Sequence, residues 1–83
     1  MITAQQIRAG RAALGWSAGD LARHSGLALR TLASIETTNG TLQARKSTLL
    51  AIKAALEAAG IEFIGTPDDA PGIRIHLPRS PAG

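Results

Sequence analysis

The chain has 83 residues, which is enough for one small domain. It contains no cysteine, so disulfides and thiolate metal sites are excluded. Hydrophobic residues make up 45% of the sequence, yet only Trp16 and Phe63 are aromatic, so Leu, Ile and Ala must form the core. The longest apolar run, Leu49–Ile52, is too short to cross a membrane, and no signal peptide is visible. We therefore expect a cytoplasmic protein with no membrane partner.

The net charge of +3 is unevenly distributed along the chain. Residues 1–56 carry a net charge of +5, whereas residues 57–83 carry −2. A basic body with a mildly acidic tail indicates that the first part meets a polyanion and the second part does not. The alternative is that scattered cations only keep a small domain in solution.

The first 59 residues predict helices that begin at capping boxes. Thr3 precedes Gln6, and Ser17 precedes Asp20, so in each pair the hydroxyl can cap an amide while the longer side chain reaches back. A third helix begins after Ala28, which lacks a capping side chain. Glycines at 15, 26, 40 and 60 are expected to end helices or turns. The expected helices cover residues 4–14, 18–25, 29–37 and 45–59.

After Gly60 the pattern changes to that of strands. Residues 61–64 and 73–77 predict two short strands, the second alternating with period two, and residues 66–72 have turn chemistry. The expected fold is mainly α: a compact four-helix domain over 1–60, a two-strand β extension over 61–78, and a disordered tail over 79–83.

Residues 17–36 read as two short helices joined by a turn at Gly26, the core of a helix-turn-helix. The stretch Ser17–Leu27, with its Leu-Ala-x-x-x-Gly spacing, resembles the first helix and turn of the phage-repressor, or XRE-type, family. Leu29–Glu36 is similar to the recognition helix of that family, and Gln6–Gly15 is similar to its first helix. The resemblance covers about residues 3–59 and implies a lambda-repressor-like DNA-binding domain.

Two positions depart from the family pattern. Ala18 stands where members commonly have Gln, and Ala28 stands where they have Ser or Thr. Both family residues help to hold a DNA phosphate. The departures imply weaker anchoring of the DNA backbone at the helix ends, compensated by cations elsewhere.

The resemblance implies a set of residues that contact DNA. Those expected to contact bases are Leu29, Arg30, Thr31 and Ser34. Arg30 can bind guanine O6 and N7, and Leu29 can meet a thymine methyl group. Those expected to contact phosphates are Ser17, Asn39, Arg45 and Lys46. The family also implies a structural ion pair between Arg11 and Glu36.

Other chemistry is not indicated. His24 and His76 have no ligand partner at metal-binding spacing, and no nucleophile, phosphate-loop or paired-carboxylate motif occurs. We therefore expect no enzyme activity, no metal, no cofactor and no small-molecule ligand.

The sequence thus predicts a homodimeric regulator of transcription, most simply a repressor, that binds a pseudo-palindromic operator in double-stranded DNA. One alternative is an antitoxin-like protein whose extension also binds a partner protein. Another is a protein-interaction module without DNA binding. The dimer is expected to form through the strands, with contacts from Ile61, Phe63, Ile73, Ile75 and Leu77. The rival arrangement is a hairpin within one chain, packed on its own helices.

Overall fold

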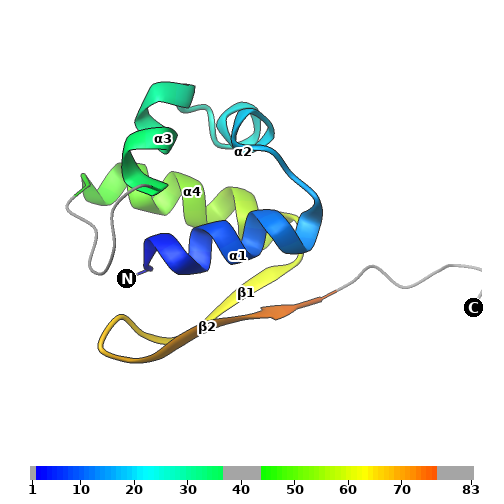
Figure 1. The fold of residues 1–83 in the computed structure, drawn as a ribbon, viewed down its shortest axis with the longest axis vertical. Helices are drawn as coiled ribbons and strands as arrows, with labels where there is room; N and C mark the ends of the chain where they lie inside the picture. The colour runs from blue at the N-terminus through cyan, green and yellow to red at the C-terminus, as the bar shows by residue number, and fades with distance from the viewer. Residues whose placement is uncertain (1, 37–43, 77–83) are drawn as a thin grey trace, which may run out of the picture.

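The chain folds into helices followed by a two-stranded antiparallel hairpin (Figure 1). The computed structural model describes residues 2–36 and 44–76. The helices in these ranges are α1 (Ala4–Leu14), α2 (Ala18–Ser25), α3 (Leu29–Glu36) and α4 (Lys46–Ala58), and the strands are β1 (Ile61–Thr66) and β2 (Asp69–Ile75). The expectation of a mainly helical chain with a short pair of C-terminal strands is confirmed.

Reciprocal capping boxes begin α1 and α2, as the sequence predicts. Thr3 Oγ1 accepts a hydrogen bond from Gln6 N at 3.1 Å, while Gln6 Oε1 accepts one from Thr3 N at 2.8 Å. Ser17 and Asp20 repeat the arrangement at 3.1 and 2.9 Å. Each box satisfies amides that the first helical turn leaves without a partner, so it fixes where the helix begins.

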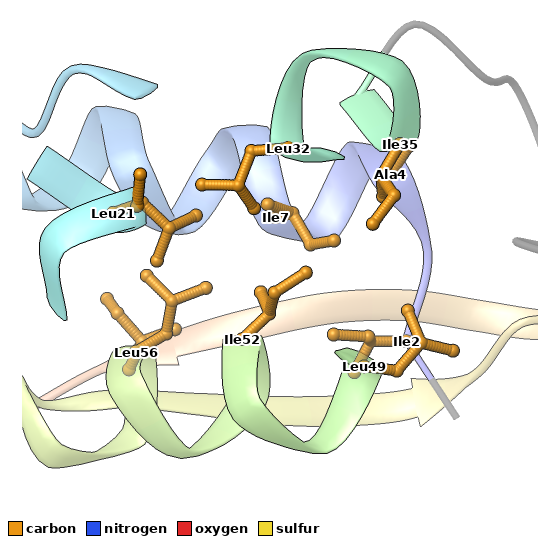
Figure 2. Packing of buried hydrophobic residues seen from close by; sticks show 11 residues of the cluster. Ile2, Ala4, Ile7, Leu21, Leu32, Ile35, Leu49, Ile52 and Leu56 are labelled. Atoms are coloured by element: carbon orange, nitrogen blue, oxygen red, sulfur yellow. The ribbon is translucent and has the colours of Figure 1, made fainter. Parts of the chain in front are cut away.

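The core lies between α1 and α4 and consists of aliphatic side chains. Figure 2 shows Leu49, Ile52 and Leu56 along one face of α4, with Ile7 of α1 across the core from them. Burying each such side chain contributes about 1.5–3 kcal/mol. The largest fully buried side chains are Ile7, Leu21, Leu32, Ile52, Leu56 and Ile61.

The hairpin is longer than the sequence predicts, and its turn is shorter. β1 and β2 pair with Ile61 opposite Ile75 and Thr66 opposite Asp69, so the turn is confined to residues 67 and 68. The expected strand limits of 61–64 and 73–77, and the long turn over 66–72, are therefore wrong. A bulge in β2 sets Ala70 and Pro71 opposite Gly65, whose φ is +73°, and allows the pairing to continue into residues with poor strand propensity.

The hairpin packs on the chain's own helices, which is the rival arrangement considered above. β1 contacts α4, and β2 contacts α1. Gly10 lies at this contact, where a Cβ would meet the Leu56 side chain at 3.4 Å and that of Ile61 at 3.5 Å, both ordinary van der Waals distances. Ile61 is only 1% exposed and belongs to the same core as the helices, so the boundary expected at residue 60 does not separate two cores.

The elements form layers. Figure 1 shows α1 and α4 between α3 on one side and the hairpin on the other, and α3 contacts α1 and α2. The surface of α3 is therefore presented on the side of the molecule away from the sheet. Among the described residues, no helix has both the length and the apolar character needed to cross a membrane.

Candidate nucleic-acid interface

The connection between α2 and α3 is a tight turn at Gly26. The residue has φ +73°, a left-handed conformation that glycine adopts without a steric penalty, and its N–H bonds to Ala22 O. Leu27 N also donates to Ala22 O, at 3.1 Å. α3 begins without a polar cap, and its first intrahelical bond runs from Leu32 N to Ala28 O at 3.2 Å. The turn thus sets α3 at a fixed angle to α2.

α3 is strongly two-sided. Leu32, Ile35 and Glu36 are buried and hold the helix against the rest of the molecule. The opposite face is exposed, and it carries Leu29, Arg30, Thr31, Ala33 and Ser34. Leu29 is 53% exposed, an unusual position for a large aliphatic side chain in so small a domain. The side chains expected to contact bases therefore share one open surface.

An open hollow of about 560 Å³ lies between this face of α3 and the start of α4. It brings together Arg30, Thr31 and Ser34 from α3 with Arg45 at the start of α4. The remaining lining residues are Ile35, Ala44 and Thr48. The hollow thus combines two guanidinium groups with three hydroxyl groups, a donor set that suits phosphate and base-edge acceptors.

Within the described ranges, the cations near the hollow are not neutralised by an ion pair. Arg30, Arg45 and Lys46 are exposed, and within the described ranges none of them forms an ion pair. Arg45 is the N-cap of α4 and makes no side-chain capping bond. A cation at a helix N-terminus opposes the helix dipole, so Arg45 and Lys46 cost helix stability unless an anion is bound.

Glu36 anchors the C-terminal end of α3 to α1. Arg11 Nε lies 2.6 Å from Glu36 Oε1, and the two side chains are 21% and 8% exposed, so the predicted ion pair is present and partly buried. Arg11 Nη1 also donates to Trp16 O at 3.0 Å. Arg8 donates from Nη1 to the carbonyl oxygen of Glu36, a contact that no sequence pattern indicated. Two arginines of α1 therefore fix the orientation of α3.

The start of α2 holds Ser17, one of the expected phosphate contacts. Its hydroxyl is engaged in the capping box, and the side chain lies at the surface. The hydrogen bond from Ser17 N to Asp20, together with the Ser17 hydroxyl and the nearby Arg23, holds the pKa of the Asp20 carboxyl below its ordinary value of 3.8. Trp16 stacks on His24 of α2, with 4.2 Å between ring centroids and an interplanar angle of 4°.

The residues expected at a dimer interface differ in how far the hairpin leaves them exposed. Ile61 is buried in the core, Phe63 and Ile73 are partly buried against it, and Ile75 is 47% exposed. Ile61 is therefore not available to a second chain, because α1 and α4 already cover it. Leu77 and Asn39 lie outside the described residues.

The outer face of the hairpin carries a small charged cluster. Glu62 lies 2.6 Å from His76 Nε2 and 3.3 Å from Arg74 Nη1. The hydrogen bond with His76 and the charge of Arg74 hold the pKa of the Glu62 carboxyl below its ordinary value of 4.5. No group of three His, Cys, Asp or Glu residues able to hold a metal ion occurs within 2–36 and 44–76.

The sequence matches no protein-family model, and a search of curated proteins finds no relative. The assignment of a function therefore depends on these residues and on their geometry.

Proposed function

We propose that this chain binds double-stranded DNA sequence-specifically, with α2 and α3 acting as a helix-turn-helix. The observation that carries the proposal is the hollow between α3 and α4, which gathers Arg30, Thr31 and Ser34 with Arg45 on one exposed surface. The resemblance of residues 3–59 to the XRE-type family supports the same interpretation.

In this proposal α3 lies in the major groove, which is wide enough to admit an α-helix. Arg30 donates to O6 and N7 of a guanine, a pairing that discriminates by about 1–3 kcal/mol. Thr31 and Ser34 lie on the same exposed face and contact neighbouring base edges. Leu29 packs against a thymine methyl group, which accounts for its exposure in the free chain.

Phosphate contacts flank the groove. Arg45 and Lys46 precede or begin α4, where exposed helix amides add to their positive field. Ser17, at the start of α2, is the third expected phosphate contact among the described residues. Asn39 stays a prediction. These contacts supply affinity and register, whereas those of α3 supply specificity.

The biological role that follows is regulation of transcription, most simply repression, by a homodimer that occupies a pseudo-palindromic operator. Two copies of α3 then read two half-sites one helical turn apart, about 34 Å. An antitoxin-like role, in which the hairpin also binds a partner protein, is compatible with the same DNA surface.

Binding of random and of selected duplexes, measured by fluorescence anisotropy over a range of salt concentrations, tests the proposal. A DNA-binding protein loses affinity linearly in a plot of log K against log salt, with a slope of about −0.9 for each phosphate neutralised. Arg45→Ala should make the slope less steep by about one unit. Arg74→Ala, which removes the same charge from the hairpin on the other side of the molecule, should leave it unchanged.

A chain that binds no duplex at low salt would refute the proposal and favour a protein-interaction module. Equal effects of Arg45→Ala and Arg74→Ala on the salt slope would show that only the net charge matters. That result would contradict the proposal that the surface between α3 and α4 binds DNA.

A further inference from the structure

Within residues 2–36 and 44–76, the outer edge of β2 carries backbone groups without a hydrogen-bond partner. His76 N donates to Gly60 O at 2.7 Å, and in an antiparallel ladder the hydrogen-bonded positions alternate. The backbone N–H and C=O groups of Arg74 and Gly72 therefore face β1. Those of Ile73 and Ile75 point away from it. The sheet of the described residues has two strands only, so nothing in those ranges pairs with this edge.

The two edges of the hairpin differ. β1 begins at Ile61, which is 1% exposed and covered by the helices, whereas Ile75 directly opposite is 47% exposed. Pro71 also lies in β2, and a proline fits a strand where its nitrogen faces away from the ladder. An apolar side chain is thus left exposed beside the edge of β2, which favours this edge over that of β1 for pairing. Exposed strand edges pair readily with another strand.

We propose that β2 pairs antiparallel with β2 of a second copy of this chain, centred on Ile73, to give a continuous four-stranded sheet. Ile73 exchanges backbone hydrogen bonds with Ile73 of the second copy, and Ile75 N donates to the carbonyl oxygen of Pro71 across the interface. Only the biological use of this dimer rests on the proposed function.

Charge selects this register. Pairing centred on Arg74 would set the two Arg74 side chains directly opposite each other, which is destabilising. Pairing centred on Ile75 would set Arg74 opposite His76, two side chains that already share Glu62 within one chain. In the register centred on Ile73, Arg74 lies opposite Gly72 and keeps its own Glu62 at 3.3 Å. Ile75 then lies opposite Pro71, which covers its exposed side chain.

The resulting symmetry suits a two-fold DNA site. Antiparallel pairing of two identical edge strands places the two-fold axis perpendicular to the sheet, so the helices of both copies lie on the same face. Because α1 and α4 separate α3 from the hairpin, both copies of α3 then lie on the side away from the sheet and face the same direction (Figure 1).

Sedimentation of the full chain without DNA tests the dimer, with two matched variants. Ile75 and Leu50 are both 47% exposed, but Leu50 lies on α4. We expect a dimer at micromolar concentration, a dissociation constant raised at least about tenfold by Ile75→Lys, and no change with Leu50→Lys. Circular dichroism verifies that both variants fold. A wild-type chain that stays monomeric, or a dimer that survives Ile75→Lys, overturns the proposal.

Single cysteines test the register, since the chain contains none of its own. Oxidation should crosslink Ile73→Cys, whose copies face each other, and should not crosslink Arg74→Cys, whose copies lie diagonally. The reverse pattern overturns the Ile73 register. A monomer that still binds a half-site duplex refutes the dimer alone, whereas a dimer that binds no duplex refutes the proposed function alone.

Discussion

Gln6 Nε2 lies 2.8 Å from the carbonyl oxygen of Gly72 and so ties the first helix to the last strand. The same nitrogen donates to Ile64 O at 3.1 Å, while Gln6 Oε1 accepts from Thr3 N. One buried glutamine therefore begins α1 and also holds both strands of the hairpin against it. A carboxylate could perform the first task but not the second.

Gln6→Glu should lower the free energy of unfolding by about 2 kcal/mol, because it removes two donated hydrogen bonds and sets a carboxylate against two carbonyl oxygens. The capping acceptor for Thr3 N is retained. Urea denaturation measures the change. Gln5→Glu, at the exposed neighbouring position, adds the same charge to the first turn and should change stability little. Equal effects of the two variants would show that the bonds to the hairpin do not contribute.

Glu36→Ala should cost about 3 kcal/mol, because Arg11 is left without its partner in a partly buried site. The loss should appear as a lower denaturant midpoint with an unchanged m-value. Glu57→Ala removes an exposed carboxylate of α4 and serves as the control. A midpoint that barely moves in the Glu36 variant would contradict the role of this pair in holding α3.

Arg30→Ala and Lys46→Ala should affect DNA binding differently. The first removes a base contact and should relax the preference at one position of each half-site. The second removes a phosphate contact, so it should weaken all sequences alike and make the salt slope less steep by about one unit. Selection of bound sites from random DNA, followed by titration of matched and mismatched duplexes, separates the two. If both variants weaken binding to all sequences equally, Arg30 contacts a phosphate and not a base.

Asp20 should make the stability of the chain depend on pH in the acid range. Its pKa is lower in the folded chain than its ordinary value of 3.8, so its carboxylate stabilises the fold above that value. This contribution is lost as the pH falls through the folded pKa. Unfolding monitored from neutral to acid pH should therefore show a shallower decline below pH 3.8 in Asp20→Asn than in the wild type. Parallel curves would contradict this role of Asp20.

The helices could be predicted closely because their signals are local. Thr3 with Gln6, and Ser17 with Asp20, stand three residues apart, so each pair marks a helix start without reference to the rest of the chain. The ion pair of Arg11 with Glu36 was foreseen only through the family resemblance, because its members lie 25 residues apart.

The hairpin shows where the sequence was insufficient. Residues 69–72 have turn composition and poor strand propensity, yet Asp69 and Gly72 pair with β1 on either side of a bulge at Ala70 and Pro71, and β2 packs on α1. The bond from Gln6 to Gly72 spans 66 residues, and the bond from Arg8 to Glu36 spans 28. Contacts of this length depend on the packed fold, and no periodicity along the chain reveals them.

Trp16 is the only tryptophan, so the intrinsic fluorescence of the chain comes from a single place. Its ring stacks on His24, and its carbonyl oxygen accepts from Arg11, whose side chain also reaches Glu36. Tryptophan emission therefore reports on the junction of α1, α2 and α3, whereas far-ultraviolet circular dichroism reports on all the helices together. Coincident midpoints from the two signals identify one cooperative unit, and a separation between them locates an unfolding step without any added label.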